Sequence, residues 1–188
     1  MQNFKSFVFG ATAASSLILG AVTAAADNVL TVNTVQIFGT IDPAKINDYT
    51  EYMAGVNLYE ALTTLDGSGA IQPLLAESWT TSEDGLTWAF KLKNGATFQD
   101  GSPIEAKDVV WSVNRLLAIN EGPSYLFEGV LSEGSVTEID SRTVQFQLEK
   151  TYAPFLTTTP ILFVVNSDLA AENVGDGDPW AQDYIANN

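Results

Sequence analysis

Residues 75–115 constrain the fold more than any other stretch, because a distinct turn signal stands at each joint between apolar runs. Asp84-Gly85 separates two such runs, and glycine tolerates the positive φ that a tight hairpin turn requires. Apolar and polar residues alternate after this turn, which predicts a strand with one buried face. Asn94-Gly95 and Asp100-Gly101 are further turns of the same chemistry. The alternating apolar residues are Leu86, Trp88, Phe90 and Leu92.

A helix is predicted to follow Pro103, where the hydrophobic period changes. Glu105 and Asp108 lie three residues apart, and acidic side chains there can cap a helix and complement its dipole. Apolar residues then recur at helical spacing, at Val109, Val110, Val113, Leu116 and Leu117. The stretch contains no catalytic pattern, so we interpret it as a scaffold in which a β-hairpin packs on a helix.

Two further elements are predicted before this scaffold. Residues 29–35 alternate apolar and polar side chains and predict a strand. Asn47 or Asp48 is expected to cap a helix from about Tyr49 to Leu65. Part of an apolar stripe on this helix is expected from Met53, Val56, Ala61 and Leu62.

The second half of the chain predicts another hairpin and a buried segment. Residues 136–139 and 143–148 form two strand patterns joined by a turn at residues 140–142. Residues 160–166 are continuously apolar, which favours a buried strand or crossover. A last helix is expected to begin near Pro179.

Residues 1–26 have the pattern of a secretory signal peptide. Lys5 supplies the positive start, residues 7–22 are apolar and small-rich, and residues 24–26 provide a cleavage site after Ala26. A transmembrane anchor is disfavoured, because Gly and Ser interrupt the apolar run. The sequence contains no cysteine, which excludes disulfides, thiolate metal sites and a lipid-modified N-terminal cysteine. We therefore expect a mature protein free in a bacterial periplasm, without a membrane anchor.

Charge and composition narrow the function classes. The 188 residues carry a formal charge of −15, which repels nucleic acid and anionic membranes. Histidine is absent, which removes a Ser-His-Asp triad, and most carboxylates have turn or capping roles. Residues 176–179 (Asp-Gly-Asp-Pro) lack the ligand spacing and closing Glu of a calcium loop, so we interpret them as a plain turn. No enzyme activity, cofactor or metal is expected.

The 75–115 stretch resembles the signature region of the family 5 extracellular solute-binding proteins, the peptide- and nickel-binding components of ABC transporters. Glu105 departs from the threonine usual in the family. The resemblance implies a mixed α/β (α+β) fold of the periplasmic binding protein type II kind, with a cleft between two lobes. The matching residues are Leu75, Ala76, Ser78, Trp79, Ser82, Asp84, Gly85, Thr87, Phe90, Leu92, Gly95, Phe98, Asp100, Gly101, Pro103, Ala106, Asp108, Val109 and Ser112.

The resemblance also implies a division of the chain. Residues 1–26 are the signal peptide, residues 27–57 begin the large lobe, residues 58–160 form a β-hairpin and helix subdomain, and residues 161–188 return to the large lobe. The resemblance covers nearly all of residues 29–188, which correspond to about the N-terminal third of a family member. We therefore expect a partial sequence or a truncated gene.

Candidate ligand-binding residues come from the resemblance alone. Thr34, Val35 and Gln36 match the loop after the first strand, which contributes to the cleft wall in the family; the alternative is an ordinary strand end. Tyr125 is the nearest match to a tyrosine that faces the peptide in oligopeptide-binding relatives. Tyr125 and Phe127 could equally hold their loop against the domain by packing.

The implied function is capture of di- or oligopeptides and their delivery to an ABC transporter permease by a protein that is monomeric at full length. Binding of nickel or another small solute is the alternative within the family. A secreted hydrolase and a purely structural envelope protein are alternatives from other classes. Ligand-induced stabilisation separates a binding protein from a structural one, because a ligand that binds only the folded state raises stability by mass action.

Overall fold

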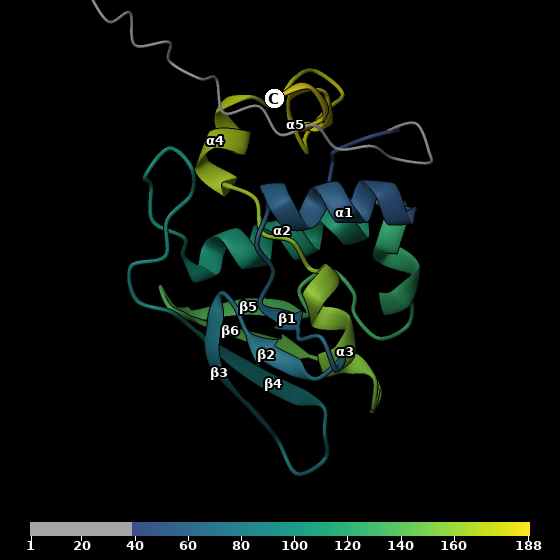
Figure 1. The fold of residues 1–188 in the computed structure, drawn as a ribbon, viewed down its shortest axis with the longest axis vertical. Coiled ribbons are helices and arrows are strands. Elements are labelled where there is room, and N and C mark those ends of the chain that lie inside the picture. Colours follow the sequence, from purple (N-terminus) through teal and green to yellow (C-terminus); the bar gives the residue numbers. More distant parts are fainter. Residues whose placement is uncertain (1–38) are drawn as a thin grey trace, which may run out of the picture. The chain divides into compact units, whose positions relative to one another are not determined.

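Two antiparallel hairpins meet edge to edge in one four-stranded sheet in the computed structural model, which describes residues 39–188 (Figure 1). The first hairpin pairs β3 (Ala76–Thr81) with β4 (Thr87–Leu92), and the second pairs β5 (Val136–Asp140) with β6 (Thr143–Gln147). Both predicted hairpins are confirmed, and Gly85 has the positive φ, 71°, that its turn requires. The strand order β3-β4-β6-β5 places β4 and β6 at the centre.

Helix α2 (Ala106–Ile119) lies against this sheet (Figure 1), closest to β5 and β6 rather than to the β3–β4 hairpin of the predicted scaffold. It buries Val109, Val113 and Leu116 in the same core as the inward side chains of β4 and β6. Aromatic rings form the centre of that core: the centroid of Phe146 lies 5.5 Å from that of Phe90 and 5.4 Å from that of Phe155.

Asp108 caps α2 as predicted and also holds a distant segment. The backbone N–H of Glu105 donates to Asp108 Oδ2 at 2.8 Å. The other oxygen, Oδ1, accepts from the backbone N–H and the hydroxyl of Ser167, at 3.0 and 2.6 Å. Ser167 begins α4 (Ser167–Glu172), so one buried carboxylate fixes the starts of two helices.

Helix α1 (Tyr49–Leu58) begins at the expected N-cap, Asp48, but the prediction that it continues to Leu65 is wrong. Tyr59 is extended, and β1 (Thr63–Leu65) pairs with β2 (Ile71–Pro73). The backbones of Ala61 and Leu62 bond in a sheet-like manner to residues 74–76, which ends the helix early. Long-range pairing has therefore overridden a local helical pattern.

The apolar residues of α1 are also placed differently from the expected stripe. Ala61 and Leu62 are buried, but they lie beyond the helix. Tyr49, Met53 and Val56 lie on α1 with 73%, 45% and 44% of their surface exposed. The buried side of α1 is instead polar and small, with Thr50, Glu51 and Gly55.

The remaining segments are short. After α2 come η1 (Gly122–Phe127), α3 (Phe155–Thr158) and η2 (Thr159–Ile161). The apolar run at residues 160–166 is buried at Leu162, Phe163 and Val164 as expected, but it forms an isolated bridge to Ala61 and no strand.

The last helix, α5 (Gln182–Asn187), begins three residues after Pro179. The backbones of Gly175 and Asp178 pair first, and Ala181 takes a left-handed conformation with φ 49°. This confirms the turn predicted at residues 176–179.

The predicted strand at residues 29–35 and the signal peptide at residues 1–26 lie outside the described residues. The divisions at residues 27–57, 58–160 and 161–188 stay predictions. No helix within residues 39–188 is both long and apolar enough to cross a membrane.

Candidate functional site

The predicted site residues have very different environments. Tyr125 lies on η1 with 71% of its surface exposed, whereas Phe127, two residues later, is completely buried in the main core. The packing interpretation therefore accounts for Phe127, and Tyr125 is the member of the pair that a ligand can reach. Thr34, Val35 and Gln36 lie outside the described residues.

Buried residues and backbone hydrogen bonds anchor the base of η1, the part of its backbone that carries the exposed Tyr125 ring. Pro123 and Ser124 are buried, and the backbone carbonyl of Phe127 accepts hydrogen bonds from the N–H groups of Val130 and Leu131, at 2.9 and 3.0 Å. An exposed aromatic side chain on such a base can offer flat contact area with little loss of backbone freedom on binding.

Gly122, the first residue of η1, lies directly against the 42–46 loop, the residues that precede the start of α1. Gly122 has a φ of 48°, and a Cβ added there would lie 2.8 Å from each of three backbone atoms: the carbonyl oxygens of Ala44 and Ile46 and the carbonyl carbon of Lys45. Real Cβ atoms essentially never approach a backbone so closely. Only glycine therefore fits this contact without a backbone shift.

A buried ion pair holds the 42–46 loop. Arg115 on α2 donates to both carboxylate oxygens of Asp42, at 2.5 and 2.7 Å, and both side chains are almost completely buried. Arg115 Nε also donates to the carbonyl oxygen of Trp180 at 2.8 Å, and its guanidinium lies 5.8 Å from the ring centroid of Trp111. The pair joins positions 73 residues apart, and no local pattern in the sequence marks either partner.

A second buried carboxylate holds the chain just before and after this loop. Glu51 on α1 accepts hydrogen bonds from the backbone N–H groups of Gly39, Thr40 and Asn47, at 3.1, 3.1 and 2.9 Å. It is 4% exposed, so these three donors satisfy a carboxylate that would otherwise be costly to bury. Glu51 therefore holds both ends of residues 39–47, and the ion pair with Arg115 holds Asp42 between them.

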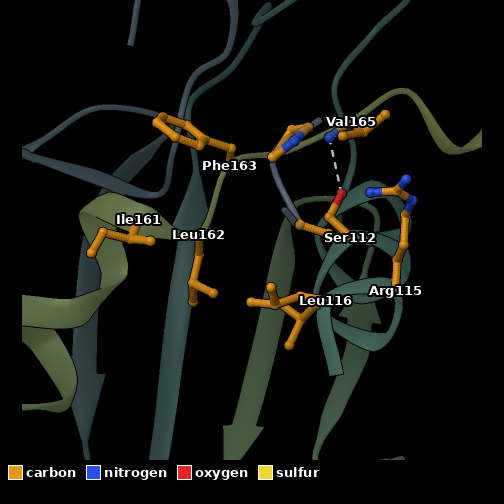
Figure 2. A pocket seen from close by; sticks show the side chains of 10 residues that line it. Ser112, Arg115, Leu116, Ile161, Leu162, Phe163 and Val165 are labelled. Carbon is orange, nitrogen blue, oxygen red and sulfur yellow. Dashed lines mark hydrogen bonds between the residues drawn. The ribbon is translucent and has the colours of Figure 1, made fainter. Parts of the chain in front are cut away.

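A small cavity lies between α2 and residues 161–165 (Figure 2). The hydroxyl of Ser112 accepts from the N–H of Val165 at 2.9 Å, and Arg115 is already paired as described above. Figure 2 shows the side chains of Leu116 and Leu162 near one another, below the Ser112–Val165 hydrogen bond. Because these polar groups already bond to other groups of the protein, we interpret the cavity as a gap in the packing rather than a ligand site.

A wider, more open hollow lies between α2 and α4. The rings of Trp111 and Trp180 line it, 5.7 Å apart, and Lys107 Nζ pairs with Asp168 Oδ2 at 2.7 Å. The buried Oδ1 of Asn114 has no hydrogen-bond partner. Within residues 39–188, no group of three or more His, Cys, Asp or Glu side chains is placed to hold a metal.

Burial raises the pKa of the Tyr59 phenol to about 12, the Asp42 charge adds to the rise, and Arg115 opposes it. Since this pKa exceeds its ordinary value of 10.0, the phenol's contribution to stability is complete below pH 10 and is lost as the pH rises from 10 to 12.

We expect a phenolate absorbance titration of the native protein minus that of Tyr59→Phe to show one group ionising near pH 12. In denaturant, the same difference titration should show this group ionising near pH 10. A native difference near pH 10 would contradict the burial.

Comparison with known proteins indicates a family, which the geometry alone does not. A family model described as bacterial extracellular solute-binding proteins, family 5 Middle, matches residues 70–187. The chain is 33% identical over 156 residues to the probable D,D-dipeptide-binding periplasmic protein DdpA of Escherichia coli K12, covering 79% of this chain and 29% of that protein. It is 29% identical over 156 residues to the nickel-binding periplasmic protein of the same strain, covering 83% and 29%.

The fold agrees with solved structures. OppA of Burkholderia pseudomallei superposes with a TM-score of 0.64 at 30% sequence identity, covering 78% of this chain and 31% of that one. The described fold is thus that of one part of these larger molecules. The chain spans about three tenths of the length of each of these relatives.

Proposed function

The chain belongs to the bacterial extracellular solute-binding proteins of family 5, and we propose that it captures peptides and delivers them to the permease of an ABC transporter. The family match supports solute binding. The exposed ring of Tyr125 on its tightly held base is the observation that favours a peptide as the solute. A phenol ring offers apolar contact area and one polar handle, which suits ligands that share a backbone and differ in side chains.

The proposed mechanism is capture without catalysis. An extended peptide is held mainly by hydrogen bonds to its backbone, while its side chains enter roomy, hydrated pockets. Closure of two lobes around the peptide then forms the state that docks on the permease. The proposal places the protein free in the periplasm, after removal of residues 1–26, and as a monomer.

Nickel or another small solute is the second candidate, because one relative is named a nickel-binding periplasmic protein. Isothermal titration separates the two candidates directly. The protein expressed from its complete gene is titrated with di- and oligopeptides, and separately with nickel in the presence and absence of free histidine. Peptide binding alone supports the proposal, whereas nickel binding alone would replace it with the second candidate.

Tyr125→Ala is expected to weaken peptide binding about tenfold, the equivalent of about 1.4 kcal/mol, because it removes an aromatic contact with ligand. Tyr125→Phe should retain most of the affinity, since it keeps the ring. The measurement is the peptide Kd by titration calorimetry on the protein from the complete gene.

Ile139→Ala is the matched control, because Ile139 is also a large exposed side chain, at 58%, but lies on β5. Its Kd should equal that of the unmodified protein. Equal affinities for Tyr125→Ala and the unmodified protein would remove Tyr125 from the site while leaving solute binding itself intact.

A further inference from the structure

We infer that the 42–46 loop is a rigid support that sets the position of the Tyr125 ring, and that Gly122 is the positioning residue through which it acts. The inference rests on the proposed function, because it assigns a role to residues that do not touch the ligand. No local sequence pattern indicates that Gly122 lies against this loop.

The contact between Gly122 and the loop is made by backbone alone. The three atoms that a Cβ would meet at 2.8 Å all belong to the main chain of residues 44–46. A flexible side chain could turn aside, but these atoms can move only with the loop or with η1. Any residue other than glycine must therefore displace one of the two segments.

Internal hydrogen bonds and the ion pair hold the loop in place. The N–H groups of Lys45 and Ile46 bond to the carbonyl oxygen of Asp42, at 2.9 and 3.1 Å, and Asp42 Oδ1 accepts from the N–H of Ala44 at 3.0 Å. The bidentate pair with Arg115 then ties this closed turn to α2. Moving the loop would break a buried ion pair, which is costly.

The far end of η1 is equally fixed, because Phe127 is completely buried. With the 42–46 loop and Phe127 both held, residues 123–126 take up a displacement of Gly122, and Tyr125 is the exposed one among them. Binding groups have to be held within about 0.5 Å of their productive positions. A shift large enough to relieve a 2.8 Å approach exceeds that tolerance.

Gly122→Ala tests the inference by its coupling to Tyr125. In the protein expressed from its complete gene, we expect this change to raise the peptide Kd by about 3- to 10-fold, within the range that coupled residues show. In the Tyr125→Ala background the same change should have no further effect on Kd. If Gly122 had only a structural role, Gly122→Ala would lower the melting temperature, and any effect on Kd would simply add to that of Tyr125→Ala.

Gly134→Ala is the matched control. Gly134 also has a positive φ, 82°, but a Cβ there would meet nothing within 4 Å. It carries the same kind of backbone strain without the contact, so it should lower stability and leave the peptide Kd unchanged. Should Gly122→Ala fail to fold, Ala44→Gly, which loosens the loop backbone without breaking the ion pair, replaces it in the same cycle.

The outcomes separate the inference from the function on which it rests. An unchanged Kd for Gly122→Ala, or additivity with Tyr125→Ala, would overturn the inference while the function stands. A normal Kd for Tyr125→Ala overturns the role of Tyr125 and the inference together. No binding of any peptide or solute by the unmodified protein overturns the proposed function.

Discussion

Replacing Arg115 with methionine should destabilise the folded protein by about 3–5 kcal/mol, the cost of breaking a buried pair by removing one partner. Asp42 would remain in a site that is 0% exposed, without the two guanidinium donors that compensate its charge. The carbonyl oxygen of Trp180 would also lose the donor that it receives from Arg115 Nε. The free energy of unfolding is measured by urea denaturation, followed by circular dichroism.

Two controls show whether burial causes this loss. Lys91→Met removes a pair of similar chemistry whose side chains are 56% and 39% exposed, and should cost no more than about 1 kcal/mol. Adding Asp42→Leu to Arg115→Met should recover much of the stability, because an apolar pair needs no compensating charge. A loss below about 1 kcal/mol for Arg115→Met would contradict the buried pair.

Phe90→Ala is expected to cost about 3–5 kcal/mol, the range for removal of a buried aromatic side chain from a core. Phe90 is completely buried at the centre of the sheet, and four aromatic rings have centroids between 5.5 and 6.4 Å from its own. Truncation leaves a cavity between β4, β6 and α3 that these rings can fill only in part. Those rings are Trp79, Trp88, Phe146 and Phe155.

The matched control for Phe90 is Phe98→Ala, because Phe98 is a partly buried residue at the margin of the same core. It should cost clearly less than Phe90→Ala in the same urea experiment. Phe90→Leu should cost less than Phe90→Ala, since it leaves a smaller cavity. Equal losses for Phe90→Ala and Phe98→Ala would show that the sheet centre is not the main source of stability.

Local patterns were sufficient for the elements whose causes are local. The turn at Asp84-Gly85, the alternation along β4 and the acidic pair at Glu105 and Asp108 predicted a hairpin and a capped helix, and the structure confirms both. A turn or a cap involves residues within a few positions of each other. Its chemistry is therefore complete in a short stretch of sequence.

The end of α1 shows where local patterns fail. The segment after Leu58 continues an apolar spacing compatible with a helix, but its backbone finds partners in residues 71–76 and in Phe163. Those bonds, together with burial of Ala61 and Leu62, outweigh the small free-energy preferences that favour helix. The candidate site shows the same limit, since alternation cannot say that Phe127 is buried and Tyr125 is exposed.

Local sequence patterns were enough to predict both hairpins, the capped helix α2 and the resemblance to a family that the family match then confirmed. The folded protein alone reveals that β4 pairs with β6, that Arg115 meets Asp42, and that Gly122 lies against the 42–46 loop. The difference follows from the range of the forces involved. Turns and caps are satisfied by neighbours along the chain, whereas buried charges and close backbone contacts depend on partners that folding brings together from distant positions.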